Sequence, residues 1–243
     1  MDTKDLYLVY QDWNHSYHRL HSEEVTLWRY KEEYKKRISK RIPKEMVNYT
    51  CEQWCEFAYN FNMRFVRDCW EKRIDGATYN NMLDTVAFPF QITAKLKSND
   101  QVYANLAFRG DGMCLSFINE CNLIYICYNF DVLLNSEGEY IKKKEGYLFL
   151  NCIKLIYYSA NSKENDKRPV TDLLFDPDGR LRKHEFYYNE MGEPLERFSG
   201  TGEPLNVTSN WQKYPIFGDW LPLFEMKRWK DGELTSPFID NSK

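Results

Sequence analysis

The sequence lacks the glycine-rich motifs that bind phosphate groups. Its 11 glycines form neither G-x-x-x-x-G-K-[ST] nor G-x-G-x-x-G, in which backbone N–H groups cradle nucleotide phosphates. The nucleophile elbow of many hydrolases, G-x-S-x-G, is also absent. These absences exclude the enzyme classes that depend on those motifs, and they leave no catalytic residue and no cofactor to assign.

Long apolar runs are also lacking. No run approaches the roughly 18–20 residues that a membrane-spanning helix needs, because Asn129 and Asp131 interrupt the best candidate. The N-terminal stretch MDTKDLYLVYQDWNH has no basic region followed by an apolar one, as a secretory signal would. We therefore expect a cytoplasmic protein without a membrane partner.

An excess of basic residues is missing as well. The chain holds 33 Lys/Arg against 36 Asp/Glu, for a net charge of −3, whereas general nucleic-acid binders carry a basic footprint. The one basic run, 35–41, lies at the end of a predicted helix, where positive charge complements the helix dipole. A nucleic-acid-associated module is therefore only a second alternative.

The seven cysteines show no C-x-x-C spacing, and their number is odd. Most lie inside apolar patterns, which predicts reduced, buried thiols in a reducing compartment. They are Cys51, Cys55, Cys69, Cys114, Cys121, Cys127 and Cys152.

What the chain does contain is enough apolar and aromatic material for a sizeable core, at 43% and 16% of its 243 residues. We predict a single α+β domain over 1–243. Residues 1–75 are expected to be mainly helical, 86–158 to form an antiparallel sheet, and 170–243 to add β-hairpins in a second small sheet or in an extension of the first. The polar stretch 159–169 is the best linker candidate.

Two helices are predicted near the N-terminus. Ser22 precedes the first, over 23–41, whose apolar residues recur at helical spacing. Thr50 and Gln53 form a capping box at the start of the second, which should end near Arg73. We expect the two helices to pack as a hairpin on a common surface.

The strongest strand signals are two runs of β-branched and aromatic residues, Leu123–Leu134 and Gly146–Tyr158. We predict that they pair as central antiparallel strands. Residues 90–96, with the strands after them, add to the same sheet, whereas 5–13 fits either an edge strand or a helical turn. Residues 211–223 carry two prolines and several aromatics, and we expect a packed irregular loop there.

Histidine chemistry is sparse. His15, His18 and His21 recur in steps of three with Asp12 upstream, but helical zinc pairs usually use a step of four, so no metal site is assigned. His184 is the only other histidine. An alternative function is a hydrolase-like enzyme in which His184 acts as a general base near Glu185 and Glu190.

The last third combines carboxylates with aromatic side chains, the usual composition of a protein–protein interface. An equally simple interpretation places these aromatics in the local core of small hairpins. The candidate partner-binding residues are Asp176, Asp178, Glu185, Tyr187, Glu190, Glu193, Glu196, Trp211 and Trp220.

The segment FDPDGRLRKHEFYYNEMGEPLERF (175–198) resembles the strand–Asp-Gly–strand pattern common in bacterial polymorphic-toxin loci. The chain as a whole is similar to the aromatic-rich, mildly acidic immunity proteins that bacteria keep against their own toxins. This resemblance implies a cytoplasmic inhibitor that neutralises a toxin or effector, such as a basic nuclease-like protein, by direct binding. It carries over no functional residues.

Overall fold

The computed structural model describes most of the chain. The described residues are 3–38, 44–72, 89–109, 112–131, 147–157, 169–188, 193–224, 229–230 and 233–234. Several predictions fall wholly or partly outside them: the linker over 159–169, of which only Pro169 is described, the last residues of the first helix (39–41), the end of the second helix near Arg73, and the candidate residue Glu190. Among the described helices, none is long and apolar enough to span a membrane.

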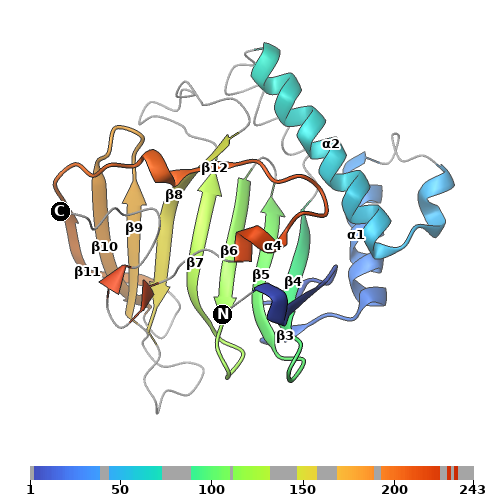
Figure 1. The fold of residues 1–243 in the computed structure, drawn as a ribbon, viewed down its shortest axis with the longest axis horizontal. Coiled ribbons are helices and arrows are strands. Elements are labelled where there is room, and N and C mark those ends of the chain that lie inside the picture. The colour runs from blue at the N-terminus through green and yellow to red at the C-terminus, as the bar shows by residue number, and fades with distance from the viewer. Residues whose placement is uncertain are drawn as a thin grey trace.

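One antiparallel sheet of ten strands dominates the fold (Figure 1). Nine strands follow the order β1-β4-β5-β6-β7-β8-β9-β10-β11, and β12 pairs with β8. The strands are β1 (Leu6–Val9), β4 (Phe90–Leu96), β5 (Val102–Arg109), β6 (Gly112–Ile118), β7 (Ile124–Asp131), β8 (Tyr147–Ile156), β9 (Pro169–Phe175), β10 (Leu181–Tyr188), β11 (Pro194–Thr201) and β12 (Trp211–Lys213).

The predicted central pair is confirmed, because β7 and β8 are antiparallel neighbours in the middle of the strand order. Of the two predictions for residues 5–13, the edge strand is confirmed, since β1 pairs only with β4 among the described strands. The hairpin strands β9, β10 and β11 continue the same sheet through the pairing of β9 with β8. Of the two predicted arrangements for the last third, the extension is therefore observed for β9 to β11, whereas residues 229–230 and 233–234 form a separate two-stranded sheet.

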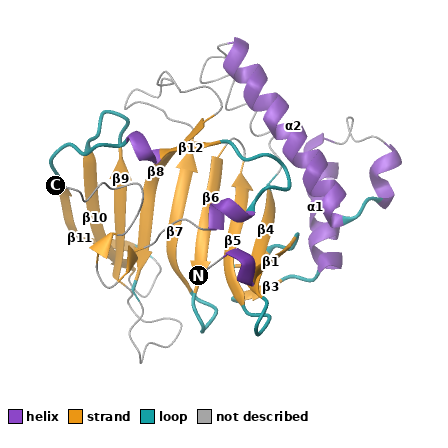
Figure 2. Ribbon diagram, in the orientation of Figure 1, coloured by secondary structure: helices purple, strands orange, loops and turns teal. Residues whose placement is uncertain are grey.

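Two helices lie beside the β4 side of the sheet (Figure 2). α1 (Glu23–Ile38) begins after Ser22, whose hydroxyl accepts a bond from the Val25 N–H at 3.3 Å. α2 (Cys51–Lys72) begins with both predicted capping-box bonds, Thr50 N–H to Gln53 Oε1 at 2.8 Å and Gln53 N–H to Thr50 Oγ1 at 3.3 Å. The α+β prediction is confirmed.

The helices pack together through aromatic rings. The Tyr34 ring of α1 lies 5.1 Å from the Trp54 ring of α2, centroid to centroid. Tyr59, also on α2, reaches the sheet, with its ring 6.1 Å from Phe90 and 5.7 Å from Phe108. These edge-on contacts are the geometry that aromatic quadrupoles favour, and they join the helical hairpin to the sheet as predicted.

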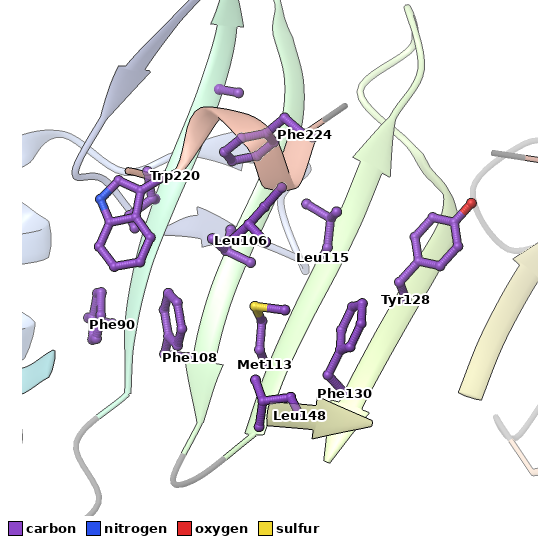
Figure 3. Packing of buried hydrophobic residues seen from close by; sticks show 14 of the residues in the cluster. Phe90, Leu106, Phe108, Met113, Leu115, Tyr128, Phe130, Leu148, Trp220 and Phe224 are labelled. Atoms are coloured by element: carbon purple, nitrogen blue, oxygen red, sulfur yellow. The ribbon is translucent and has the colours of Figure 1, made fainter. Parts of the chain in front are cut away.

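The main core lies on one face of the sheet, where large apolar side chains alternate with polar ones that point the other way. Figure 3 shows part of this core, with Trp220 and Phe224 beside the aromatic and aliphatic side chains of β4 to β7. The remaining short elements are η1 (Thr3–Asp5), β2 (Trp13–Asn14), β3 (Arg19–Leu20), η2 (Lys44–Asn48), η3 (Thr208–Asn210), α4 (Leu221–Phe224), β13 (Trp229–Lys230) and β14 (Glu233–Leu234).

The prediction of an irregular loop over 211–223 is wrong in part. Residues 211–213 form β12 on the edge of β8, and α4 begins at Leu221. The C-terminal segment (203–224) returns across the core face of the sheet (Figure 1). Its aromatic residues provide both a strand that pairs with β8 and side chains that fill the core. The two prolines within 211–223 favoured the prediction of an irregular loop instead.

Candidate functional site

A row of polar side chains crosses the sheet on the face opposite the main core. Cross-strand partners in a sheet project from the same face, and the register joins one residue from each strand from β4 to β11. This polar row consists of Thr93, Asn105, Ser116, Cys127, Lys154, Asp172, His184 and Ser199.

Burial decreases along the polar row. Thr93, Asn105 and Ser116 are buried, the next members are partly exposed, and Ser199 is exposed. The buried end is satisfied internally, because Asn105 Nδ2 donates to Thr93 Oγ1 and Thr93 Oγ1 donates to the Gln11 carbonyl, both at 2.9 Å. Function that requires access to solvent is therefore restricted to the middle and the β11 end of the polar row.

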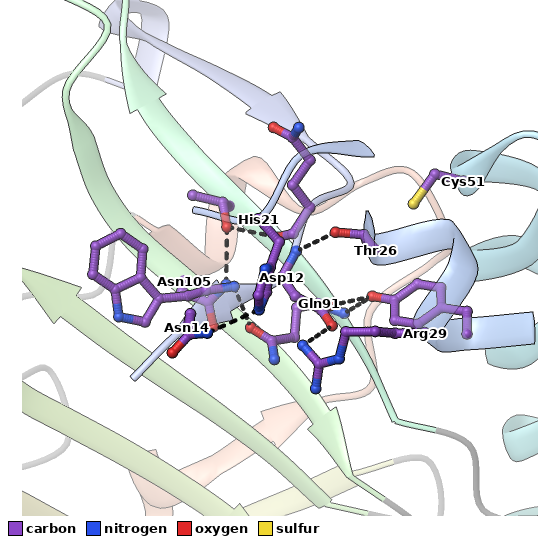
Figure 4. A network of polar contacts seen from close by, with 12 residues as sticks. Asp12, Asn14, His21, Thr26, Arg29, Cys51, Gln91 and Asn105 are labelled. Carbon is purple, nitrogen blue, oxygen red and sulfur yellow. Dashed lines mark hydrogen bonds and ion pairs between the residues drawn. The ribbon is translucent and has the colours of Figure 1, made fainter. Parts of the chain in front are cut away.

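The N-terminal hairpin of β2 and β3 is joined to the β4 end of this face. The Trp13 N–H donates to the Gln91 side-chain oxygen at 2.9 Å. Beside it, Asp12 is buried and accepts bonds from the Tyr30 hydroxyl at 2.6 Å and from Arg29 at 3.0 Å (Figure 4). Burial raises the pKa of Asp12, although these two partners oppose the shift. Through these two bonds, Asp12 links α1 to the start of the β2–β3 hairpin.

At the other end, three neighbouring strands place a serine, a histidine and an aspartate in register. Ser199 Oγ lies 3.4 Å from His184 Nδ1, and Asp172 pairs with His184 along the sheet. The nearest ionic partner of Asp172 is Lys154, at 3.6 Å. In a hydrolytic triad the carboxylate holds Nδ1 and the serine faces Nε2. Here Nδ1 faces the serine, so the arrangement does not match that geometry.

Charge near the middle of the polar row is controlled by the pair of Lys154 and Asp172. Burial opposes the charge on Lys154, but the Asp172 carboxylate and other neighbours raise the pKa of Lys154 overall. Burial raises the pKa of Asp172, and the ammonium group of Lys154 opposes this shift. The pair places a protonated amine beside the thiols of the adjoining strands.

The cysteines depart from the prediction of buried core thiols. Cys51 and Cys55 are buried as predicted, and both are free. By contrast, Cys114, Cys127 and Cys152 are partly exposed, because strand alternation turns them toward the polar face. Cys121 is exposed in the connection between β6 and β7.

The predicted acidic and aromatic residues do not form one cluster. Asp176 and Asp178 lie in the turn between β9 and β10, paired with Arg182 and Arg180 at 3.3 Å each. Glu193 precedes β11 at the opposite end of that strand pair. Eight-residue strands separate these ends by roughly 25 Å. The two groups of carboxylates therefore belong to different surfaces.

The structure does bring Glu185 and Tyr187 together with β11. Glu185 pairs with Phe198 and Tyr187 pairs with Leu195, so these four side chains share the face that holds the core farther along the sheet. Beyond the core this face is open: Leu195 is 42% exposed and Phe198 is 48% exposed. Glu196 pairs with Phe186 and projects from the opposite face.

The two candidate tryptophans serve the fold. Trp220 is fully buried, and its indole N–H donates to the Tyr10 hydroxyl at 3.1 Å. It therefore belongs to the core and does not reach a partner, which corrects its assignment as a partner-binding residue. Trp211 is half-buried, and its ring lies 4.9 Å from Phe149 across the pairing of β12 with β8.

The histidines near the N-terminus lie in and beside the β2–β3 hairpin and not on a helix. His21 Nε2 contacts the Asn14 side-chain nitrogen at 3.0 Å. Within the described ranges, no group of three or more His, Cys, Asp or Glu residues is placed to hold a metal ion.

The inner strands carry a weak sequence signal for the polar row. A polar residue stands between two apolar ones, as Thr93 does between Ile92 and Ala94, and Ser116 between Leu115 and Phe117. The signal is weak in any one strand. The polar residues can be recognised as one row only when the register of the eight strands is known, and that register is set by long-range pairing.

Comparisons with known proteins add nothing to these observations. No protein-family model, curated protein or solved structure matches the chain.

Proposed function

We propose that the protein is a cytoplasmic binding protein of the immunity type, which neutralises a basic toxin or effector protein by direct contact. The contact surface in this proposal, called here the β11 surface, consists of the strand itself and the apolar side chains beside it. The observation that carries the proposal is the exposure of β11 along almost its whole length, including Leu195 and Phe198.

An exposed strand at the end of a sheet is a template for pairing with another chain. β11 ends the strand order, and among the described strands only β10 pairs with it. Proteins usually protect such edges with short strands, proline or inward-facing charge. β11 is eight residues long and has its proline only at its first position, and one bulge interrupts its pairing with β10 between Glu185 and Phe186. No described strand covers its outer edge.

The charges around β11 favour a basic partner. Glu193, Glu196 and Glu203 are exposed at or beside the strand, against Arg197 on the strand and Lys183 of β10, whose ammonium lies 5.8 Å from the centre of the Phe198 ring. Complementary charge increases the association rate and discriminates among partners, while buried apolar anchors supply most of the affinity. Leu195 and Phe198 would be those anchors, and Tyr187 lies in register beside Leu195.

The test compares partner capture by the wild-type protein and by Leu195→Asp/Phe198→Asp. We expect the wild type to retain one basic protein at equal stoichiometry, measured by native mass spectrometry, and the double variant to lose it by at least about tenfold in affinity, because two apolar anchors become charged. The captured protein, produced alone, should arrest growth of the host cells, and co-production of the wild-type chain should restore growth.

Two controls separate this surface from general effects. Ile216→Asp/Trp28→Asp places the same charges on apolar side chains that are 74% and 62% exposed elsewhere, and it should retain the partner. His184→Ala should also retain it, whereas a hydrolase-like function at His184 would be impaired by this change. Equal capture by the β11 variant and the wild type would refute the binding surface. A captured protein that is harmless to cells would refute the immunity role.

A further inference from the structure

We propose that Cys114 is a site of reversible S-thiolation that reacts with anionic low-molecular-weight disulfides. The site consists of the Cys114 sulfur, the neighbouring groups Ser116 and Cys127, and the basic side chains Arg109 and Lys154. It lies on the opposite face of the sheet from Leu195 and Phe198, and this inference does not depend on the proposed binding function.

The sheet register gathers the sulfur atoms. Cys114 on β6 pairs with Asn129 on β7, which in turn pairs with Cys152 on β8. Ser116 links Cys114 to Cys127, which lies two residues before Asn129 on β7. The Ser116 hydroxyl oxygen lies 3.6 Å from Cys114 Sγ, and the hydroxyl donates to Cys127 Sγ at 3.4 Å. Three strands thus place three partly exposed thiols on one small area of the polar face.

The groups around Cys114 stabilise its thiolate. Hydrogen bonding from Cys127 lowers the pKa of the Cys114 thiol to about 7; burial opposes this shift, and Ser116, Arg109 and Lys154 add to it. The bond to Cys114 and burial raise the pKa of Cys127, so Cys114 is the first of the two thiols to ionise. Asp172 is the nearby acid, and it is paired with Lys154.

The chemistry is thiol–disulfide exchange. The Cys114 thiol loses its proton to solvent, and the thiolate attacks one sulfur of a disulfide RS–SR. A new S–S bond forms between Cys114 Sγ and one RS group, the original S–S bond breaks, and the other RS group leaves as a thiolate that takes up a proton. The small disulfide is the oxidant, and excess RSH reverses the reaction. Arg109 and Lys154 favour a disulfide that carries carboxylates.

The experiment treats the native full-length protein with oxidised glutathione, which is anionic, or with cystamine, which is cationic, and locates adducts by peptide mass spectrometry. The exposed Cys121 in the same molecule is the internal control. We expect the rate of adduct formation at Cys114 to rise less than about twofold between pH 7.5 and 9. The rate for an unperturbed thiol with a pKa near 8.5 would rise about eightfold.

Charge selectivity is the second readout. Relative to Cys121, Cys114 should prefer glutathione disulfide over cystamine by about threefold or more at low ionic strength, and Arg109→Gln should reduce this preference. Cys114→Ser should remove the corresponding adduct. Reaction at Cys121 with none at Cys114 before denaturation would overturn the proposal, as would an eightfold rise in rate at Cys114 over the same pH range.

Discussion

Asp12 shows how much a single residue can contribute to joining two elements. Its carboxylate is buried between Tyr30 and Arg29 of α1, while its backbone N–H donates to Thr26 Oγ1 at 3.2 Å. Burying a carboxylate is costly unless its oxygens are satisfied. The raised pKa of Asp12 indicates that burial destabilises the charged carboxylate more than Tyr30 and Arg29 stabilise it.

A pH-dependent stability follows from this raised pKa. An acid that is harder to ionise when folded contributes stability below its ordinary pKa of 3.8, and that contribution is lost as the pH rises through the folded value. We expect Asp12→Asn, which cannot ionise, to gain stability relative to the wild type as the pH rises from about 4 toward 7. Urea denaturation at several pH values would measure the difference, and Glu120→Gln, at an exposed position between β6 and β7, is the control. A constant difference across the pH range would contradict the assignment.

At the scale of single elements, the turn between β9 and β10 holds the start of the C-terminal segment. The Leu205 N–H donates to the Gly179 carbonyl at 2.8 Å, and Gly179 has φ +91°. A Cβ at Gly179 would collide with the Leu205 carbonyl oxygen. Gly218 has nearly the same backbone angle, φ +89°, but open space where a Cβ would be.

These two glycines form a matched pair for mutation. Gly218→Ala should cost about 1 kcal/mol, the strain of a left-handed residue with a side chain. Gly179→Ala should cost about 2 kcal/mol more, because the same strain is joined by a backbone collision. The free energy of unfolding in urea provides the measurement, and equal losses for both variants would show that Leu205 does not pack against the turn.

The elements also show which features the sequence determines locally. The capping box of Thr50 and Gln53 and the strand Phe90–Leu96 were predictable from nearby residues, and both are confirmed. The role of Trp220 was not, since most of its ring contacts lie on β4, β5 and α2, more than a hundred residues away. The polar row depends on register across eight strands, and no short stretch of sequence encodes that register.

At the scale of the whole molecule, Trp220 joins regions that are distant in the sequence. Its ring lies 5.3 Å from both Tyr59 on α2 and Phe108 on β5, and its indole N–H reaches Tyr10 near β1. Helical hairpin, sheet and C-terminal segment therefore share one core. This shared core supports the prediction that the chain is a single domain.

Replacing Trp220 tests that prediction. We expect Trp220→Ala to lower the free energy of unfolding by about 4 kcal/mol, since it leaves a large cavity in a packed core. Trp28→Ala, on a side chain 62% exposed, should change it by less than about 0.5 kcal/mol. In the wild type, helix loss by circular dichroism and tryptophan fluorescence should follow one urea transition. Two separate transitions would show that the helices and the sheet unfold as independent domains.

The position of the C-terminal segment has a consequence for synthesis on the ribosome. Phe90 and Phe108 are translated more than a hundred residues before Trp220 and Phe224, the side chains that lie over this part of the sheet. Until these late residues leave the exit tunnel, the nascent sheet presents an uncovered aromatic face, the kind of surface that aggregates or recruits chaperones. Completion of this part of the core therefore waits for residues that are translated more than a hundred positions after the strands they cover.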